Sequence, residues 1–162
     1  MRKNFLYILI ASVLLISCNG KNALNLNNTI VKANEDLKVA SQVFNKQFEA
    51  VKDNNYAVLE LERQNMVNLI DKKIKEVSEA KSNMPGGDDF KNSFTDYYKF
   101  EKDIYENEFK DICKLTGAEG DGEKLTGIAI RMQVKAPKEN SMEAAIHSQQ
   151  TNFAKKNNLK LQ

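Results

Sequence analysis

The sequence predicts an all-α protein, an up-down four-helix bundle whose fourth helix is short and follows an irregular segment. Three observations predict this fold. The 162 residues include only two prolines and seven glycines, and so few helix breakers favour long regular elements. Apolar residues recur at helical spacing in several long stretches. Short runs rich in Asn, Asp, Gly or Pro separate these stretches, and short connections between long helices are typical of antiparallel bundles.

The first helix is predicted to begin near Asn27 or Asn28, whose short polar side chains can cap the first free amides. Its core positions follow a heptad repeat. Ile30, Leu37, Phe44 and Val51 recur every seven residues, and Leu26, Ala33, Ala40 and the polar Gln47 fill the alternate position. The repeat stops at Asp53-Asn54-Asn55. We therefore expect a tight helix–helix turn there.

The second and third helices are separated by an evident break. Apolar residues at helical spacing predict the second helix over residues 56–82, and the run Asn83-Met84-Pro85-Gly86-Gly87 ends it. The third helix opens at Asp88 or Asp89, since an acidic side chain suits the positive end of the helix dipole. It is rich in aromatic residues and is predicted to stop at Gly117.

Residues 121–140 fit two patterns. Ile128, Ile130, Met132 and Val134 alternate as in a strand, while other apolar residues of the segment fit one helical face. A lone strand in a helical chain has no partner for its hydrogen bonds, so we favour helix or irregular coil. Pro137 is expected to break the chain, and Asn140 with Glu143 to start a short final helix.

The first residues have the pattern of a secretory signal. Arg2 and Lys3 precede an apolar run from Phe5 to Ile16, which is too short to cross a membrane. The run ends in Leu15-Ile16-Ser17-Cys18, which resembles the lipobox of bacterial lipoproteins. The resemblance implies cleavage between Ser17 and Cys18, a diacylglyceryl group on the Cys18 thiol, and acylation of the new amine. We expect residues 1–17 to be the signal peptide, 18–25 a lipid-attached tether, and 26–162 a single helical bundle domain.

This lipid modification would set the location of the protein. Two or three acyl chains hold a protein on a membrane essentially permanently, although the polypeptide does not cross the membrane. Asn19 is not the aspartate that retains enterobacterial lipoproteins at the inner membrane, so the outer membrane is favoured. The residues after Cys18, "NGKN", contain no acidic export signal. This favours the periplasmic face over the cell surface.

Composition excludes several functional classes. Removing residues 1–17 takes away Arg2 and Lys3 and brings the net charge from +2 to zero, so no nucleic-acid partner is expected. Cys113 is the only thiol left once Cys18 is lipidated, which leaves no internal disulfide. We interpret Cys113 as a small buried apolar residue.

No combination of residues indicates a catalytic, metal or cofactor site, so we expect neither enzyme activity nor a cofactor. The single histidine, His147, excludes a di-iron bundle, which needs two. A Glu143–His147 pair offers two zinc ligands where at least three are needed, and we expect both side chains on a solvated face. The loop "GAEGDGEKLTG" lacks the Gly-Lys-Ser/Thr ending of a phosphate-binding loop.

Polar residues on the apolar faces predict one internal feature. Arg63 and Glu108 lie on the core faces of the second and third helices, where charge is costly unless paired. In an up-down hairpin, residues equidistant from the turn lie level, which places Arg63 beside both Gln47 and Glu108. We therefore predict a polar layer of Gln47, Arg63 and Glu108. Such a layer either fixes the helix register or lines a pocket for a small polar ligand.

Two further residues of the third helix attract attention. Glu101 lies on the same face as Glu108, one heptad earlier, with no evident partner at its level. Phe100 lies about 120° from the centre of the aromatic stripe, at roughly 100° per residue. We therefore expect Phe100 to be partly exposed and to be a possible contact for a partner.

The whole chain resembles a family of small helical surface lipoproteins of Bacteroidota and leptospires, of unknown function. The resemblance rests on the lipobox, the Asn- and Lys-rich helical body, "GGDDFKNSF" and "QQTNFAKKNNLKL". It implies a membrane-tethered envelope protein and no catalytic residues. We expect a non-catalytic interaction or structural module at the outer membrane, with an envelope protein as its partner. The alternatives are a carrier of a small polar ligand in the bundle interior and a surface adhesin.

Overall fold

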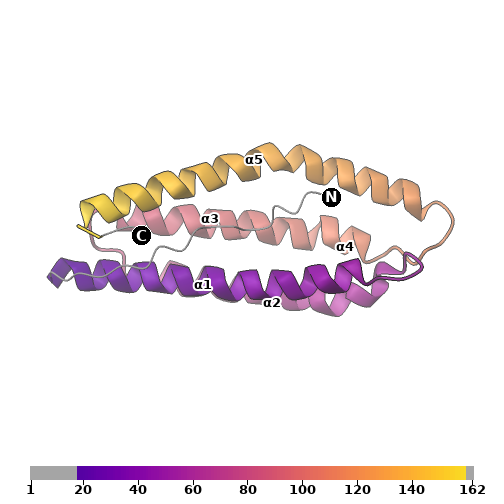
Figure 1. Ribbon diagram of the computed structural model, residues 1–162, viewed down its shortest axis with the longest axis horizontal. Helices are drawn as coiled ribbons and strands as arrows, with labels where there is room; N and C mark the ends of the chain where they lie inside the picture. Colours follow the sequence, from indigo (N-terminus) through magenta and orange to yellow (C-terminus); the bar gives the residue numbers. More distant parts are fainter. Residues whose placement is uncertain (1–17, 160–162) are drawn as a thin grey trace.

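The structure, a computed structural model, describes residues 18–159. It confirms the all-α helical bundle. The helices lie side by side along an elongated molecule (Figure 1). In chain order, the elements are α1 (Cys18–Glu49), the 3₁₀ turn η1 (Tyr56–Leu59), α2 (Glu60–Glu79), α3 (Gly87–Glu106), α4 (Glu108–Ile112) and α5 (Asp121–Lys156).

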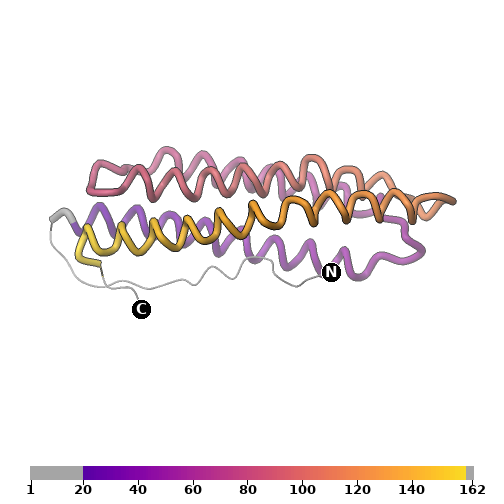
Figure 2. The backbone as a smooth tube through the Cα atoms, turned by 90° about the horizontal axis from the view of Figure 1, so that it is seen from above, coloured from indigo at the N-terminus to yellow at the C-terminus, as the bar shows by residue number. Residues whose placement is uncertain are grey.

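The bundle is built around α3, which contacts α1, α2, α4 and α5. The helices α1 and α2 also contact each other, whereas α5 packs chiefly on α3 and α4. Seen from above, the chain runs back and forth between two ends of the molecule (Figure 2). One end holds the start of α1, the α2–α3 turn and the end of α5, and the other holds η1 and the loop before α5 (Figure 1).

The first helix begins earlier than its sequence suggested. It is already helical at Cys18, the first described residue, and does not wait for Asn27 or Asn28, so residues 18–25, expected as a tether, are helical. The reason is that Ala23 extends the core repeat: it is fully buried, as are Leu26 and Ile30. The signal segment 1–17, with Ser17, lies outside the described residues.

The largest correction concerns Pro137 and the fourth helix. The segment 121–140 is helical, Pro137 lies inside α5, and this helix is the longest of the described elements at 36 residues. Asn140 and Glu143 are therefore interior residues and not a helix start. Pro137 is exposed, so its ring faces solvent, and α5 bends in its middle (Figure 1). The carbonyl that loses its amide partner belongs to Gln133, which is also exposed.

The third helix stops short of its predicted end. It breaks at Asn107, where the backbone has φ −115° and ψ −70°, and α4 follows as far as Ile112. Its start is close to the expected position, since Asp88 and Asp89 lie in the first turn. The second helix similarly splits into η1 and α2.

Aromatic rings fill both ends of the core. Towards the end with η1, Phe44 of α1 meets Tyr105 and Phe109 edge-on, with centroids 5.3 and 4.9 Å apart. At the other end, Phe90 of α3 stacks on Phe153 of α5 with centroids 4.5 Å apart. Offset and edge-to-face pairs of this kind contribute beyond their buried area.

The turn after α1 is joined to the loop after α4. The amide of Tyr56 donates to the carbonyl of Leu115 at 2.8 Å, and Asn55 forms an isolated antiparallel bridge with Thr116. Gly117 lies against this turn with φ +85°, and a Cβ added to it would lie 2.2 Å from the carbonyl oxygen of Asp53. The close approach requires glycine.

Gly117→Ala is therefore expected to lower the free energy of unfolding by about 1–3 kcal/mol more than Gly120→Ala. Gly120 is a matched control, because its φ of +84° is the same while a Cβ there would meet no atom within 4 Å. Urea unfolding followed by circular dichroism measures both. Equal losses of unfolding free energy in the two variants would show that the contact with Asp53 does not constrain the loop.

Candidate functional site

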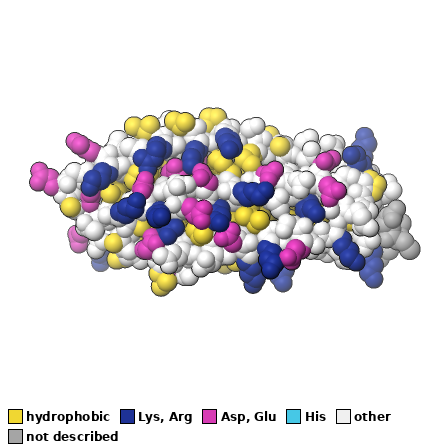
Figure 3. All heavy atoms as spheres, turned by 180° about the vertical axis from the view of Figure 1, so that it is seen from behind, with side chains coloured by type: hydrophobic (Ala, Val, Ile, Leu, Met, Phe, Trp, Pro, Cys, Tyr) yellow, Lys and Arg dark blue, Asp and Glu magenta, His cyan; other side chains and the backbone are white. Residues whose placement is uncertain are grey.

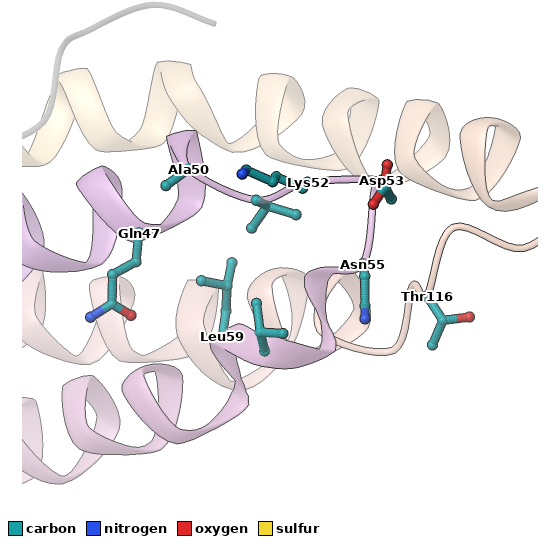
Figure 4. Close-up of a pocket in the computed structure, with 9 residues that line it drawn as sticks. Gln47, Ala50, Lys52, Asp53, Asn55, Leu59 and Thr116 are labelled. Atoms are coloured by element: carbon teal, nitrogen blue, oxygen red, sulfur yellow. The ribbon is translucent and has the colours of Figure 1, made fainter.

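A groove opens at the end of the molecule that holds η1. Its volume is about 630 Å³, and it is lined by Gln47, Ala50, Val51, Lys52, Asp53, Asn55, Val58, Leu59 and Thr116. These residues come from the end of α1, the following turn, η1 and the loop after α4 (Figure 4). Val58 is 65% exposed, and Leu61 one turn further is 67% exposed. The groove therefore combines apolar side chains with polar turn residues on an accessible surface.

The predicted polar layer of Gln47, Arg63 and Glu108 is not formed. Arg63 is buried, but it donates to Glu60 within its own helix from Nε at 2.7 Å and from Nη2 at 2.6 Å. Glu108 is also buried and pairs with Lys135 of α5 at 3.0 Å. Gln47 is exposed and lines the end groove. Each charge thus has a partner that the predicted layer did not include.

Arg63 also stabilises the end of α3. Its Nη1 donates to the carbonyl of Tyr105 at 3.2 Å, next to the break at Asn107. The hydrogen bonds from Arg63 hold the pKa of Glu60 down at about 2. A second groove of about 560 Å³ lies beside Arg63 and is lined by Val67 and otherwise by polar residues of α2, the α3–α4 break and α4. The guanidinium is engaged by Glu60 and Tyr105, so its role here is structural.

The contact between α1 and α3 contains a buried polar row. The hydroxyl of Tyr98 donates to Asn34 of α1, and burial raises the pKa of Tyr98. One heptad later on the same two helices, Ser41 and Tyr105 are both buried, and neither hydroxyl has a hydrogen-bond partner among the described residues. Burial raises the pKa of Tyr105 as well. Both tyrosines therefore stay neutral in the core.

Glu101 is the most unusual group of the interior. Its side chain is buried between α3 and α5, and Oε1 has no hydrogen-bond partner in the described chain. Burial, followed by the charge of Glu139, raises the pKa of Glu101 to about 8. Tyr97 lies beside it with a buried hydroxyl that also has no described hydrogen-bond partner. Glu101 is consequently protonated at neutral pH.

Phe100 is buried, with 6% of its surface exposed, so its expected exposure was wrong. The ring lies under α5, and the ammonium of Lys138 is 5.3 Å from its centroid. The prediction rested on the angle between Phe100 and the aromatic stripe, which was taken as the core face of the third helix. In the structure α3 is the central helix, and its neighbours cover most of its circumference.

Cys113 is buried, with 7% of its surface exposed. Burial raises the pKa of its thiol to about 11, which makes it a poor nucleophile at neutral pH. His147 is exposed on α5. Within residues 18–159, no group of three or more His, Cys, Asp or Glu side chains is arranged to hold a metal ion.

Charged side chains of both signs are interspersed over the face of the molecule shown in Figure 3. Several form ion pairs between helices, such as Lys102 with Asp71 at 2.8 Å and Arg131 with Asp111 at 2.7 Å. No helix in the described part of the chain is both long enough and apolar enough to cross a membrane.

Comparison of the chain with protein-family models, with curated proteins and with solved structures finds no significant match. The end groove is accessible, whereas Glu101, whose pKa burial raises to about 8, lies in the interior. This arrangement suits recognition at the end of the bundle better than chemistry in its interior.

Proposed function

We propose that the protein is a lipid-anchored envelope protein without catalytic activity, held at the outer membrane through acyl chains on Cys18. The observation that carries the proposal is the motif Leu15-Ile16-Ser17-Cys18 after a short apolar run. The chain that follows supports it, because the described residues next to the proposed attachment site are helical and continue directly into the bundle. The periplasmic face is the favoured location, and no cofactor is involved.

The shape of the bundle suggests what the anchored domain does. The 32 residues of α1 rise about 1.5 Å each and extend about 48 Å. The lipid would hold one end of this rod, and the groove around Gln47 and Val58 lies at the other end (Figures 1 and 4). The domain would present this groove to an envelope protein away from the membrane surface.

The exposed apolar residues at the groove favour a protein partner. Val58 in the groove and Leu61, which lies outside its lining three residues later, are both more than half exposed. Apolar side chains among polar turn residues are typical of a protein–protein contact. Loops on a rigid scaffold are also common recognition elements. The interaction would require no change in the helices.

An affinity pull-down from cross-linked envelopes tests the proposal. The four baits are the wild type, Cys18→Ala, Val58→Asp in the groove, and Val134→Asp as the matched control. Val134 is an exposed valine on α5, 73% accessible, and it does not line the groove. The wild type and Val134→Asp are expected to recover the same partner, Val58→Asp to lose it, and Cys18→Ala to be absent from the membrane fraction.

Equal recovery by Val58→Asp and the wild type would reject the groove as the contact. Membrane retention of Cys18→Ala would reject lipid anchoring. These two outcomes are separate, because the first variant keeps the proposed lipid site and the second keeps the groove.

A further inference from the structure

The middle of α5 is less buried than its two ends. Ile128 is buried near the start of the helix, and Ile146 and Phe153 are buried towards its end. No residue from 129 to 145 is buried. This stretch also contains Pro137 and the bend in α5 (Figure 1). Buried residues thus fix the two ends of α5 to the bundle, and between them only partly buried side chains, such as Met132 and Met142, pack against the core.

Polar groups hold this stretch on α3. Lys135 pairs with Asp103 and with Glu108, the latter at 3.0 Å. Lys138 lies over the ring of Phe100. Glu139, which lies one helical turn after Lys135, is half-buried, and both its burial and the charge of Glu143 raise its pKa. We call residues 129–145 the α5 strap.

Glu101 lies beneath the strap with its carboxyl buried. The groups that act on it are Tyr97 of α3 and the carboxylates of Glu139 and Glu143 of α5. Glu101 in turn raises the pKa of Tyr105, one turn later on α3, whose hydroxyl is uncharged. None of the groups that set the pKa of Glu101 is a cation. An ionised Glu101 would therefore face two carboxylates across the contact, without a counter-charge.

We propose that the α5 strap is a proton-controlled element, which the protonated carboxyl of Glu101 keeps on α3 and which separates from α3 when that proton is released to water. Separation admits water to Glu101 and moves Glu139 and Glu143 away from it. The buried ends of α5, at Ile128 and Ile146, stay in place. The ion pairs of Lys135 oppose separation and allow the strap to close again.

The direction of the pH response follows from linkage. With the strap closed, the pKa of Glu101 is about 8, well above its ordinary value of 4.5. With the strap open, the solvated carboxyl returns towards its ordinary value. Opening thus releases a proton between these two values, and its equilibrium constant rises by up to about tenfold per pH unit. The closed strap is favoured under acid conditions.

Hydrogen–deuterium exchange with peptide-level mass spectrometry tests the proposal on the mature chain carrying Cys18→Ala. Exchange is measured at pH 5.5 and 7.5 and corrected for the intrinsic rates. The opening constant of residues 129–145 is expected to rise at least tenfold at the higher pH, while residues 146–156 change little. Glu101→Gln, which cannot ionise, is expected to remove this response.

Glu139→Gln/Glu143→Gln is a second variant, which leaves Glu101 and its packing in place. It removes the facing charges, so it is expected to reduce the pH response of the strap. An unchanged opening constant in the wild type would overturn the proposal. So would a response that persists in full in both variants, because the pH dependence would then arise elsewhere.

Discussion

Replacing Glu101 with glutamine is expected to increase the free energy of unfolding at pH 7 by about 2–3 kcal/mol. The native state holds a proton on Glu101 up to about pH 8, whereas the unfolded chain releases it near pH 4.5. Stability therefore falls as the pH rises through this window, by about 1.4 kcal/mol per unit. Glutamine resembles the protonated acid and escapes this cost. Urea unfolding at pH 5 and pH 7, followed by circular dichroism, measures the difference.

The gain should fall to about 1 kcal/mol or less at pH 5, where the wild-type carboxyl is protonated in nearly all native molecules and in about a quarter of unfolded ones. Opening of the α5 strap would reduce the gain at pH 7, because water then stabilises the ionised Glu101. Glu49→Gln is the matched control, since Glu49 is exposed on α1, and it should change stability by less than about 0.5 kcal/mol. A destabilised Glu101→Gln at pH 7 would contradict the assignment of a buried neutral acid.

Phe153→Ala is expected to lower the free energy of unfolding by about 3–5 kcal/mol, the usual cost of removing a buried phenylalanine ring. Phe153 is 1% exposed and stacks on Phe90, which is fully buried. This pair fixes the end of α5 to the start of α3. The melting temperature should fall by roughly 10 °C or more, and differential scanning calorimetry measures it.

Val134→Ala is the control for this prediction, because Val134 is an exposed apolar residue of the same helix. It should shift stability by less than about 0.5 kcal/mol. If the two variants melted at the same temperature, α5 would not be held by the stacked pair at its end.

The fold class could be predicted because the heptad repeat of α1 and the helical spacing in α2 and α3 are strong local signals. The repeat was recognised from Leu26, although Ala23 already belongs to it. Alanine is a weak marker of a core position, and Ala23 stands among polar residues such as Asn22 and Asn25. The sequence therefore did not identify Ala23 as part of the repeat. Helix boundaries depend on such marginal residues.

The error at Pro137 has a different cause. Proline removes one hydrogen bond and usually ends a helix, but tertiary contacts on both sides of Pro137 can sustain it. Ile128 and Ile146 are both buried against the bundle, and the proline itself is exposed to solvent. Local sequence does not contain this information. Because the helix around Pro137 was not predicted, Lys135 could not be identified as the partner of Glu108.

The polar layer was predicted wrongly because counting residues from each turn assumes uninterrupted helices. The 3₁₀ turn η1 comes before α2, and α3 breaks at Asn107, so residues counted from the turns are not level. Arg63 instead pairs with Glu60, three residues earlier. The unpaired position of Glu101 was apparent from the sequence, but its neighbours Glu139 and Glu143 could not be found without α5.

Mass spectrometry of the N-terminal peptide, from protein purified out of the membrane fraction of its native host, tests the central claim most directly. The account predicts a chain that begins at Cys18, with a diacylglyceryl group on the thiol and an acyl group on the amine. A chain that retains residues 1–17, or one with an unmodified Cys18 in the soluble fraction, would contradict it.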